Sequence, residues 1–265
     1  MKIRLDAHFI IGNSHTVCED YAKVAYLPNT DTYVAIVSDG CSSASNTDVG
    51  SRIVSLAALK AIENGYDKHT FREIFLLNLA EFSSMLGLQH ELTATIMIAI
   101  VQDNQLIVLV QGDGVIYVEH EDHSELATIS FSENAPAYPF YSIDDDMIEQ
   151  FNDMNQKCTI TTNNNVQISN ANANDFTLIR TYNDISKIKK VVLFSDGIES
   201  FKQNNQSINM ENIYKSIIDF KNVKAGSFAI RKLTRLQKEW ALNKITHEDD
   251  LSIASIVFDM DAENA

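Results

Sequence analysis

The chain has 265 residues, of which 45% are hydrophobic and 22% charged, a mixture typical of a globular protein. A length of 265 residues is near the upper limit for one hydrophobic core, so we expect a single domain over residues 1–265. The formal net charge of -15 disfavours polyanionic partners, which excludes nucleic acid and anionic membrane surfaces from the expected partners.

The cysteines and the N-terminal segment bear on the compartment. Cys18, Cys41 and Cys158 are an odd number without paired spacing, which suits a reducing compartment better than a disulfide framework. Residues 1–15 contain only a short, interrupted apolar piece, so we expect neither a signal peptide nor a membrane anchor there. No other run approaches the ~18 apolar residues of a transmembrane helix. A cytoplasmic protein is expected.

The first half of the chain predicts a hairpin, two helices and a meander. Apolar and β-branched runs at 21–27 and 32–38 flank a turn-forming tetrapeptide and predict a β-hairpin. Apolar residues at a spacing of three to four predict helices around 53–59 and 71–82 that cover one sheet. Residues 94–119 predict three strands in an antiparallel meander.

The second half begins with a change of composition. Residues 132–174 are rich in Asn, Asp and Ser, which predicts an irregular, flap-like excursion. A strand at 189–197, helices around 209–220 and 225–243, and a last strand at 251–258 follow. Grouped strands and helices favour an α+β fold over alternating βαβ units. We therefore predict two packed, mostly antiparallel β-sheets flanked by helices, an α-β-β-α sandwich.

Acidic residues occur where predicted strands end or begin. Asp39, Asp113 and Asp196 each follow an apolar strand and precede a glycine, and Asp249-Asp250 precede the last strand. A single Asp-Gly pair is most often a plain turn, but three at strand ends are harder to assign to turns alone. Hard divalent cations prefer oxygen ligands. Two such ions about 3.5–4 Å apart could hold a hydroxide nucleophile and stabilise a phosphoryl group.

Six short segments lie in a fixed order along most of the chain. They are GNSHTVCED (12–20), SDG (38–40), ELTAT (91–95), GDG (112–114), FSDGIE (194–199) and EDDLS (248–252). Each segment is weak evidence alone, but their order and intervals together are specific. The chain resembles the protein phosphatase 2C family of metal-dependent serine/threonine phosphatases, in its shorter bacterial-type branch.

The resemblance implies hydrolysis of phosphoserine and phosphothreonine in proteins by a binuclear Mn²⁺ or Mg²⁺ centre, with a metal-bound hydroxide as nucleophile. It implies the catalytic residues Asp39, Asp196, Asp249 and His15. It implies the metal-binding residues Glu19, Asp20, Asp39, Gly40 (through its carbonyl), Asp113, Asp196 and Asp249. In this assignment Asp39 bridges both ions and Glu19 contacts one through water. Asp113 matches an aspartate that can hold a weakly bound third metal in related proteins. The second residue that usually holds this metal corresponds to Ser200 here.

The chain departs from the family pattern at two positions. His15 stands where many members carry a phosphate-binding arginine, and it would give a weaker, pH-dependent contact. Cys41 stands where many carry a histidine, so His15 or water would have to protonate the leaving oxygen. Without the resemblance, an ordinary surface histidine and a small apolar cysteine are the simpler interpretations of these two residues.

Two other functions stay open. The first is a catalytically weak or inactive phosphatase-like module that binds phosphoproteins or regulates a partner. The second is a metal-dependent hydrolase of a small phosphorylated metabolite or nucleotide, which the absence of a phosphate-cradling glycine-rich loop disfavours. For the leading hypothesis, the expected partner is a phosphorylated protein, such as the product of a cognate Ser/Thr kinase.

Overall fold

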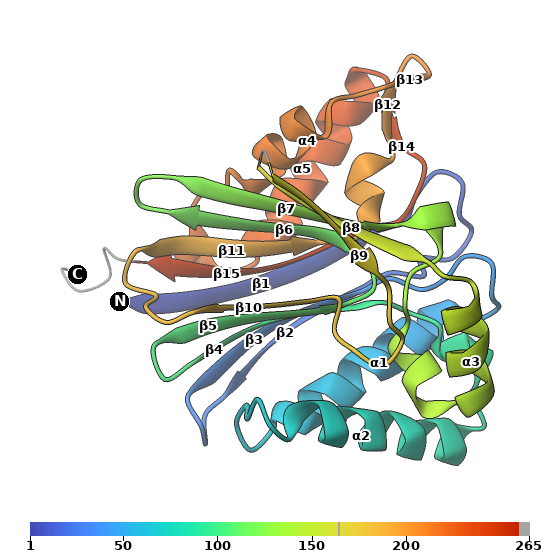
Figure 1. Cartoon of the computed structure of the whole chain (residues 1–265). Helices are drawn as coiled ribbons and strands as arrows, with labels where there is room; N and C mark the ends of the chain where they lie inside the picture. The colour runs from blue at the N-terminus through green and yellow to red at the C-terminus, as the bar shows by residue number, and fades with distance from the viewer. Residues whose placement is uncertain (164, 260–265) are drawn as a thin grey trace.

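Two antiparallel β-sheets lie face to face at the centre of the structure, a computed structural model that describes residues 1–163 and 165–259 (Figure 1). The larger sheet contains, in spatial order, β1 (Lys2–Ile10), β15 (Leu251–Asp259), β11 (Ile188–Phe194), β6 (Gly114–His120), β7 (Ser124–Phe131), β8 (Lys157–Thr162) and β9 (Asn165–Asn170). The smaller sheet contains β10 (Leu178–Tyr182), β5 (Gln105–Gln111), β4 (Ile96–Gln102), β3 (Thr32–Ser38) and β2 (Tyr21–Leu27). A separate ribbon contains β13 (Gln206–Ser207), β12 (Phe201–Gln203) and β14 (Ile245–His247).

Helices cover the outer faces of the two sheets (Figure 1). The helices are α1 (Thr47–Ile62) and α2 (Phe71–Leu86) on the smaller sheet, α4 (Met210–Ile218) and α5 (Phe228–Leu242) on the larger sheet, and α3 (Asp145–Asp153). Short 3-10 turns are η1 (His90–Leu92), η2 (Ser132–Asn134), η3 (Pro139–Ile143), η4 (Asp196–Glu199) and η5 (Val223–Ala225). The predicted α+β sandwich of two mostly antiparallel sheets flanked by helices is confirmed.

Central strands are buried on both faces, because the other sheet covers one face and helices cover the other. In β4, Met97 and Ala99 belong to the core between the sheets, whereas Ile98 packs in the core under α1 and α2. In β11, Leu193 points between the sheets and Val192 packs under α4 and α5. Strands buried on both faces have nearly continuous apolar sequences. This is why these strands could be predicted.

Most other predicted elements are present near their expected bounds. The hairpin at 21–27 and 32–38 corresponds to β2 and β3, which pair antiparallel along their whole length. The two helices predicted after it are α1 and α2, and they cover one sheet as expected. Within the described residues, no helix is both long enough and apolar enough to cross a membrane.

The three strands predicted at residues 94–119 exist, but they do not form one meander. β4 and β5 pair in the smaller sheet, whereas β6 pairs with β7 and β11 in the larger sheet. The chain changes sheets at Gly112 and Gly114, whose φ angles of 111° and 130° are rarely adopted by residues with a side chain. The meander prediction was wrong, because hydrophobic periodicity identifies strands but not their neighbours.

This change of sheet predicts a large cost for Gly114→Ala. A methyl group there would lie 2.7 Å from the carbonyl oxygen of Phe194 and 2.6 Å from the terminal carbon of Met97. Backbone strain and overpacking together should lower the free energy of unfolding by about 3 kcal/mol, measured by urea denaturation. Gly87→Ala is the control, because Gly87 has a φ of 67° but open space around it, so only about 1 kcal/mol should be lost. Equal losses in the two variants would contradict the packing argument.

Residues 132–174 are more regular than predicted, because they contain α3, β8 and β9. β8 pairs with β7 and extends the larger sheet, and it buries Cys158 and Ile160. The side chains of β9 are exposed along the whole strand. The prediction of an irregular excursion was wrong for these elements, because strands rich in Thr and Asn carry little apolar alternation.

β1 and β10 were also absent from the sequence prediction. β1 pairs with β15 over its whole length, from Lys2 opposite Asp259 to Ile10 opposite Leu251. Its pattern is obscured by Asp6, which is buried and accepts a hydrogen bond from the backbone nitrogen of Ala229 at the start of α5 (2.5 Å). A polar residue that serves a helix terminus therefore replaces an apolar one in this strand.

Candidate active site

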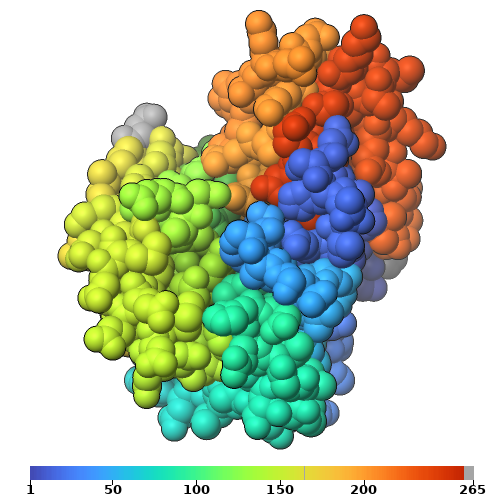
Figure 2. Space-filling view, turned by 90° about the vertical axis from the view of Figure 1, so that its right-hand side faces the viewer, coloured from blue at the N-terminus to red at the C-terminus, as the bar shows by residue number. Residues whose placement is uncertain are grey.

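Four aspartates that lie far apart in the sequence meet at one end of the sandwich. Asp39 follows β3, Asp113 precedes β6, Asp196 begins η4 directly after Ser195, and Asp249 lies just before β15. All four line one pocket of about 180 Å³. Figure 2 looks onto this end, where the segment after β7 (yellow-green) faces the segment after β3 (light blue) across a hollow. The structure thus brings these four predicted residues together.

Thr95 holds the end of β3 in place. The backbone nitrogen of Thr95 donates to the carbonyl oxygen of Asp39 (2.8 Å), and the nitrogen of Asp39 donates to Thr95 Oγ1 (3.1 Å). Ser38 Oγ donates to the carbonyl oxygen of Thr95 (2.6 Å), and Gly40 forms a β-bridge with Ala94. Residues 91–95, one of the six segments on which the family resemblance depends, therefore contain the residue that orients Asp39.

Asp20 is completely buried beside this pocket. Its Oδ2 accepts a hydrogen bond from Ser195 Oγ (2.6 Å). Among the described residues, neither Asp20 Oδ1 nor the buried Asp196 Oδ1 has a hydrogen-bond partner. Unpaired buried carboxylate oxygens are costly unless a cation neutralises them. These two oxygens fit a site that holds divalent cations.

The electrostatics of the pocket also fit cations. Burial, and then repulsion by Asp20 and Asp196, raise the pKa of Asp39 well above its ordinary value. Burial, and then Asp196, raise the pKa of Asp113 in the same way, and burial raises the pKa of Asp20 to about 7. Burial, and then repulsion by Asp196, also raise the pKa of Asp249. Clustered carboxylates of this kind need protons or cations to coexist, and oxygen donors are those that Mn²⁺ and Mg²⁺ prefer.

His15 and Glu19 lie beside this pocket, in an adjoining hollow of about 500 Å³. Ser42 lines both hollows. Glu19 Oε1 accepts a hydrogen bond from Thr47 Oγ1 (3.0 Å). His15 Nε2 lies 3.2 Å from Asp249 Oδ1, so His15 reaches the edge of the aspartate cluster. Burial alone would lower the pKa of His15, but the nearby carboxylates raise it above its ordinary value.

Asp250 organises the segment 12–20. Its Oδ1 accepts from the backbone nitrogen of Gly12 (2.7 Å), and its Oδ2 accepts from that of Glu19 (2.6 Å) and lies 3.1 Å from His15 Nδ1. Its side chain is only 2% exposed, whereas that of Asp249 is 45% exposed. The sequence reasoning gave no role to Asp250. The acidic pair before β15 was the available signal, but it did not show which aspartate points inward.

Ser200 and the segment 134–138 complete the surroundings. Ser200 Oγ accepts from the backbone nitrogen of Asp249 (3.2 Å) and donates to the carbonyl oxygen of Gly197 (2.8 Å). It therefore positions Asp249. Asn134, Pro136 and Tyr138 also line the pocket, and the sequence did not predict them as site residues.

Comparisons with known proteins agree with the fold. The family model described as protein phosphatase 2C matches residues 12–225, and the chain therefore belongs to the protein phosphatase 2C family. Comparison with curated proteins finds no match.

Solved structures of bacterial phosphatases share the fold. The serine/threonine phosphatase Stp1 from Staphylococcus aureus is 13% identical with a TM-score of 0.59, and the alignment covers 98% of this chain and 96% of that one. A bacterial serine phosphatase is 14% identical with a TM-score of 0.58, covering 97% and 98%. PppA, a regulatory component of T6SS in Pseudomonas aeruginosa, is 13% identical with a TM-score of 0.55, covering 97% and 99%.

Proposed function

We propose that this protein removes phosphate from phosphoserine and phosphothreonine in proteins, in a reaction that depends on two divalent cations, Mn²⁺ or Mg²⁺. The observation that carries this proposal is the meeting of Asp39, Asp196 and Asp249 in one pocket. Buried carboxylate oxygens of Asp20 and Asp196, which have no hydrogen-bond partner in the described part of the chain, lie with them. Family membership supports the same class of reaction.

The carboxylates of Asp20, Asp39, Asp196 and Asp249 and the carbonyl of Gly40 would hold the cations, and Glu19 would contact one of them through water. Bound there, two divalent cations would supply a nucleophile from water and neutralise charge on the phosphoryl group. A third ion at Asp113 would bind more weakly, because position 200 offers a serine hydroxyl that already bonds the backbone of Asp249 and Gly197.

His15 would assist at the rim of the pocket. Both of its ring nitrogens lie within 3.2 Å of carboxylate oxygens, and only a protonated nitrogen can donate to such an oxygen. A doubly protonated, cationic ring at this place could attract the phosphate dianion and give a proton to the leaving serine or threonine oxygen. This role belongs to the proposal and depends on Asp249 and Asp250, which orient the ring.

The shape of the site supports the proposed substrate class. The pocket of about 180 Å³ has room for a phosphoryl group, and the adjoining hollow of about 500 Å³ could take the segment that carries it. A phosphorylated protein, such as the product of a cognate Ser/Thr kinase, therefore suits the site better than a small metabolite. Because the protein has a net charge of -15, we also propose that neither nucleic acid nor a membrane is a partner. We propose further that the protein acts in the cytoplasm.

The test compares a phosphothreonine peptide, p-nitrophenyl phosphate and a sugar phosphate as substrates. Turnover of the first two is expected with Mn²⁺, none with EDTA, and full recovery when Mn²⁺ is restored. Asp196→Asn should lower the rate by more than about a hundredfold, since loss of even an outer partner of a metal ligand costs about 10–100-fold. Turnover that survives both chelation and this substitution would eliminate the proposal.

A binding or regulatory module is the second candidate, and the carboxylate contacts of His15 are the observation that favours it. Both ring nitrogens face carboxylates, so the ring is less free to contact phosphate than an arginine side chain would be. The same assay decides between the two candidates. Two bound Mn²⁺ ions without turnover of any substrate would favour the module.

A further inference from the structure

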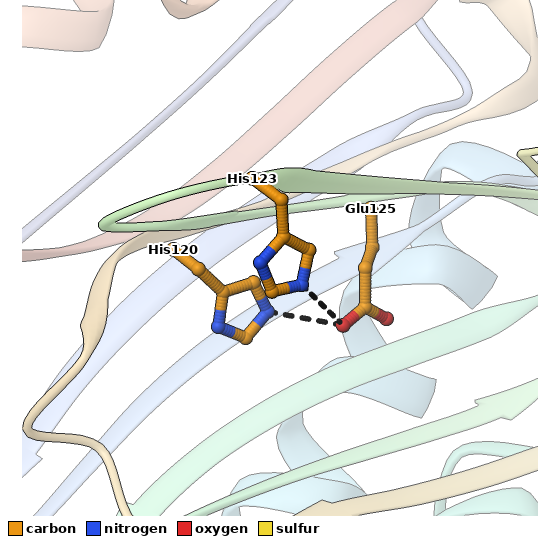
Figure 3. Close-up of side chains that lie close together, drawn as sticks. All are labelled: His120, His123 and Glu125. Carbon is orange, nitrogen blue, oxygen red and sulfur yellow. Dashed lines mark hydrogen bonds and ion pairs between the residues drawn. The ribbon is translucent and has the colours of Figure 1, made fainter.

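A second group of metal-ligand side chains lies in the hairpin that joins β6 and β7. Figure 3 shows His120, His123 and Glu125 with their side chains pointing toward one another. His120 Nε2 lies 3.0 Å from Glu125 Oε1, and His123 Nε2 lies 3.7 Å from the same oxygen. One ligand atom from each residue can be chosen so that all three lie within 4.8 Å of one another.

Further side chains hold two of these three residues in place. Asp122 Oδ1 lies 2.7 Å from His123 Nδ1, which leaves Nε2 of that ring directed at Glu125. The other oxygen of Glu125 accepts a hydrogen bond from the hydroxyl of Tyr182 (3.1 Å) and lies 3.5 Å from Arg180. Carboxylates bonded to the far nitrogen of a histidine, and donors bonded to a ligand carboxylate, are typical outer partners in metal sites.

We propose that His120, His123 and Glu125 bind Zn²⁺ or a similar borderline divalent cation. Two imidazoles and one carboxylate are a usual ligand set for zinc, and a water molecule completes four-coordination where the site is open. The site is open on one side, since the side chain of His123 is 54% exposed and that of His120 is 12% exposed. Mn²⁺ and Mg²⁺ prefer oxygen ligands, so this site selects against the cations expected at the aspartate pocket.

The distances between the ligand atoms of His120, His123 and Glu125 suit Zn²⁺. Bonds of about 2.0–2.2 Å in a tetrahedron place ligand atoms roughly 3.3 Å apart, and the two nitrogen-to-oxygen distances of 3.0 and 3.7 Å lie on either side of this value. The two imidazole rings are stacked with centroids 4.2 Å apart and planes 3° apart. Binding requires the rings to tilt so that their lone pairs converge. The exposed side chain of His123 has room to do so.

The bound cation would lie at the end of the sandwich away from the aspartate pocket, where Glu125 also contacts the smaller sheet. Glu125 belongs to β7 of the larger sheet, while Tyr182 and Arg180 belong to β10 of the smaller sheet. Asp113 directly precedes β6 and His120 is its last residue, so at about 3.3 Å per residue the two sites are about 23 Å apart. The proposal therefore does not depend on phosphatase activity.

The test titrates the untagged chain with Zn²⁺ by calorimetry at mildly alkaline pH, in a large excess of Mn²⁺ that competes for the oxygen-rich pocket. One further Zn²⁺ per chain is expected, and His123→Asn should weaken its binding at least about tenfold. His69→Asn is the matched control, because His69 is an exposed histidine outside the group. Unchanged Zn²⁺ binding in His123→Asn, or no uptake by the unaltered chain, would overturn the proposal.

A spectroscopic measurement guards against an indirect effect of substitution. Co²⁺ in place of Zn²⁺ should give the visible absorption of a four-coordinate histidine site in the unaltered chain and in His69→Asn, but not in His123→Asn. Since His123 is exposed, His123→Asn should keep the circular dichroism of the folded chain. A Co²⁺ spectrum that is the same in all three proteins would also overturn the proposal.

Discussion

Replacing Asp39 with asparagine is expected to lower Mn²⁺-dependent turnover of a phosphothreonine peptide by more than about a hundredfold. Asp39 is one of the residues that would hold the cations, and loss of even an outer partner of a metal ligand costs about 10–100-fold. The measurement is the initial rate at saturating Mn²⁺. Glu149→Gln is the matched control, because it removes one carboxylate charge from an exposed position on α3. A rate within a few-fold of the unaltered protein would contradict the assignment of Asp39.

The same substitution should change stability in opposite directions with and without cations. Burial and the neighbouring aspartates raise the pKa of Asp39 in the folded state, so this carboxyl group opposes folding at every pH above its ordinary, unfolded-state pKa. In EDTA, Asp39→Asn should therefore melt at a higher temperature than the unaltered protein. In saturating Mn²⁺ the order should reverse, since the unaltered site binds the cations more tightly.

Differential scanning fluorimetry in the two buffers measures this reversal. Glu149→Gln should leave the melting temperature nearly unchanged in both, because its carboxylate is exposed. If Asp39→Asn lowered the melting temperature in EDTA as well, the carboxylate would be stabilising the fold, and the cation interpretation of the cluster would fail.

The elements that could be predicted from the sequence are those whose burial determines a pattern of neighbouring residues. The apolar runs of β3, β4, β11 and β15 were recognisable because these strands are buried on both faces. The positions of Asp39, Asp113 and Asp196 at strand ends followed from glycine after each aspartate. These features depend only on a few neighbouring residues.

Sequence reasoning failed where partners distant in the chain decide the outcome. β6 reads like a third strand of a meander, yet the turn at Gly112 and Gly114 carries it into the other sheet. β9 has no apolar face, so nothing local distinguishes it from a loop. Asp249 and Asp250 are adjacent in the sequence, and the sequence does not show which of them is buried. The folded structure exposes much of Asp249 and buries Asp250, which accepts hydrogen bonds from the backbone of residues 12–20.

Asp250→Ala is expected to destabilise the protein by about 3 kcal/mol. The substitution would leave the backbone nitrogens of Gly12 and Glu19 without their acceptor, and each unpaired buried donor costs about 1–3 kcal/mol. His15 would also lose its contact with Asp250 Oδ2. Urea denaturation in EDTA isolates this effect from cation binding.

Asp249→Ala is the matched control, since it removes the neighbouring carboxylate with the same change of side chain. Its side chain is 45% exposed, and burial and repulsion by Asp196 raise its pKa. Asp249 Oδ1 accepts from one backbone nitrogen, that of Asp250, whereas Asp250 accepts from two. Removing Asp249 should therefore cost less stability in EDTA than removing Asp250, while Mn²⁺-dependent turnover should fall by more than about a hundredfold. The two adjacent aspartates would then separate into one that holds the segment 12–20 and one that serves the pocket. Equal losses of stability in the two variants would show that Asp250 has no special part in anchoring that segment.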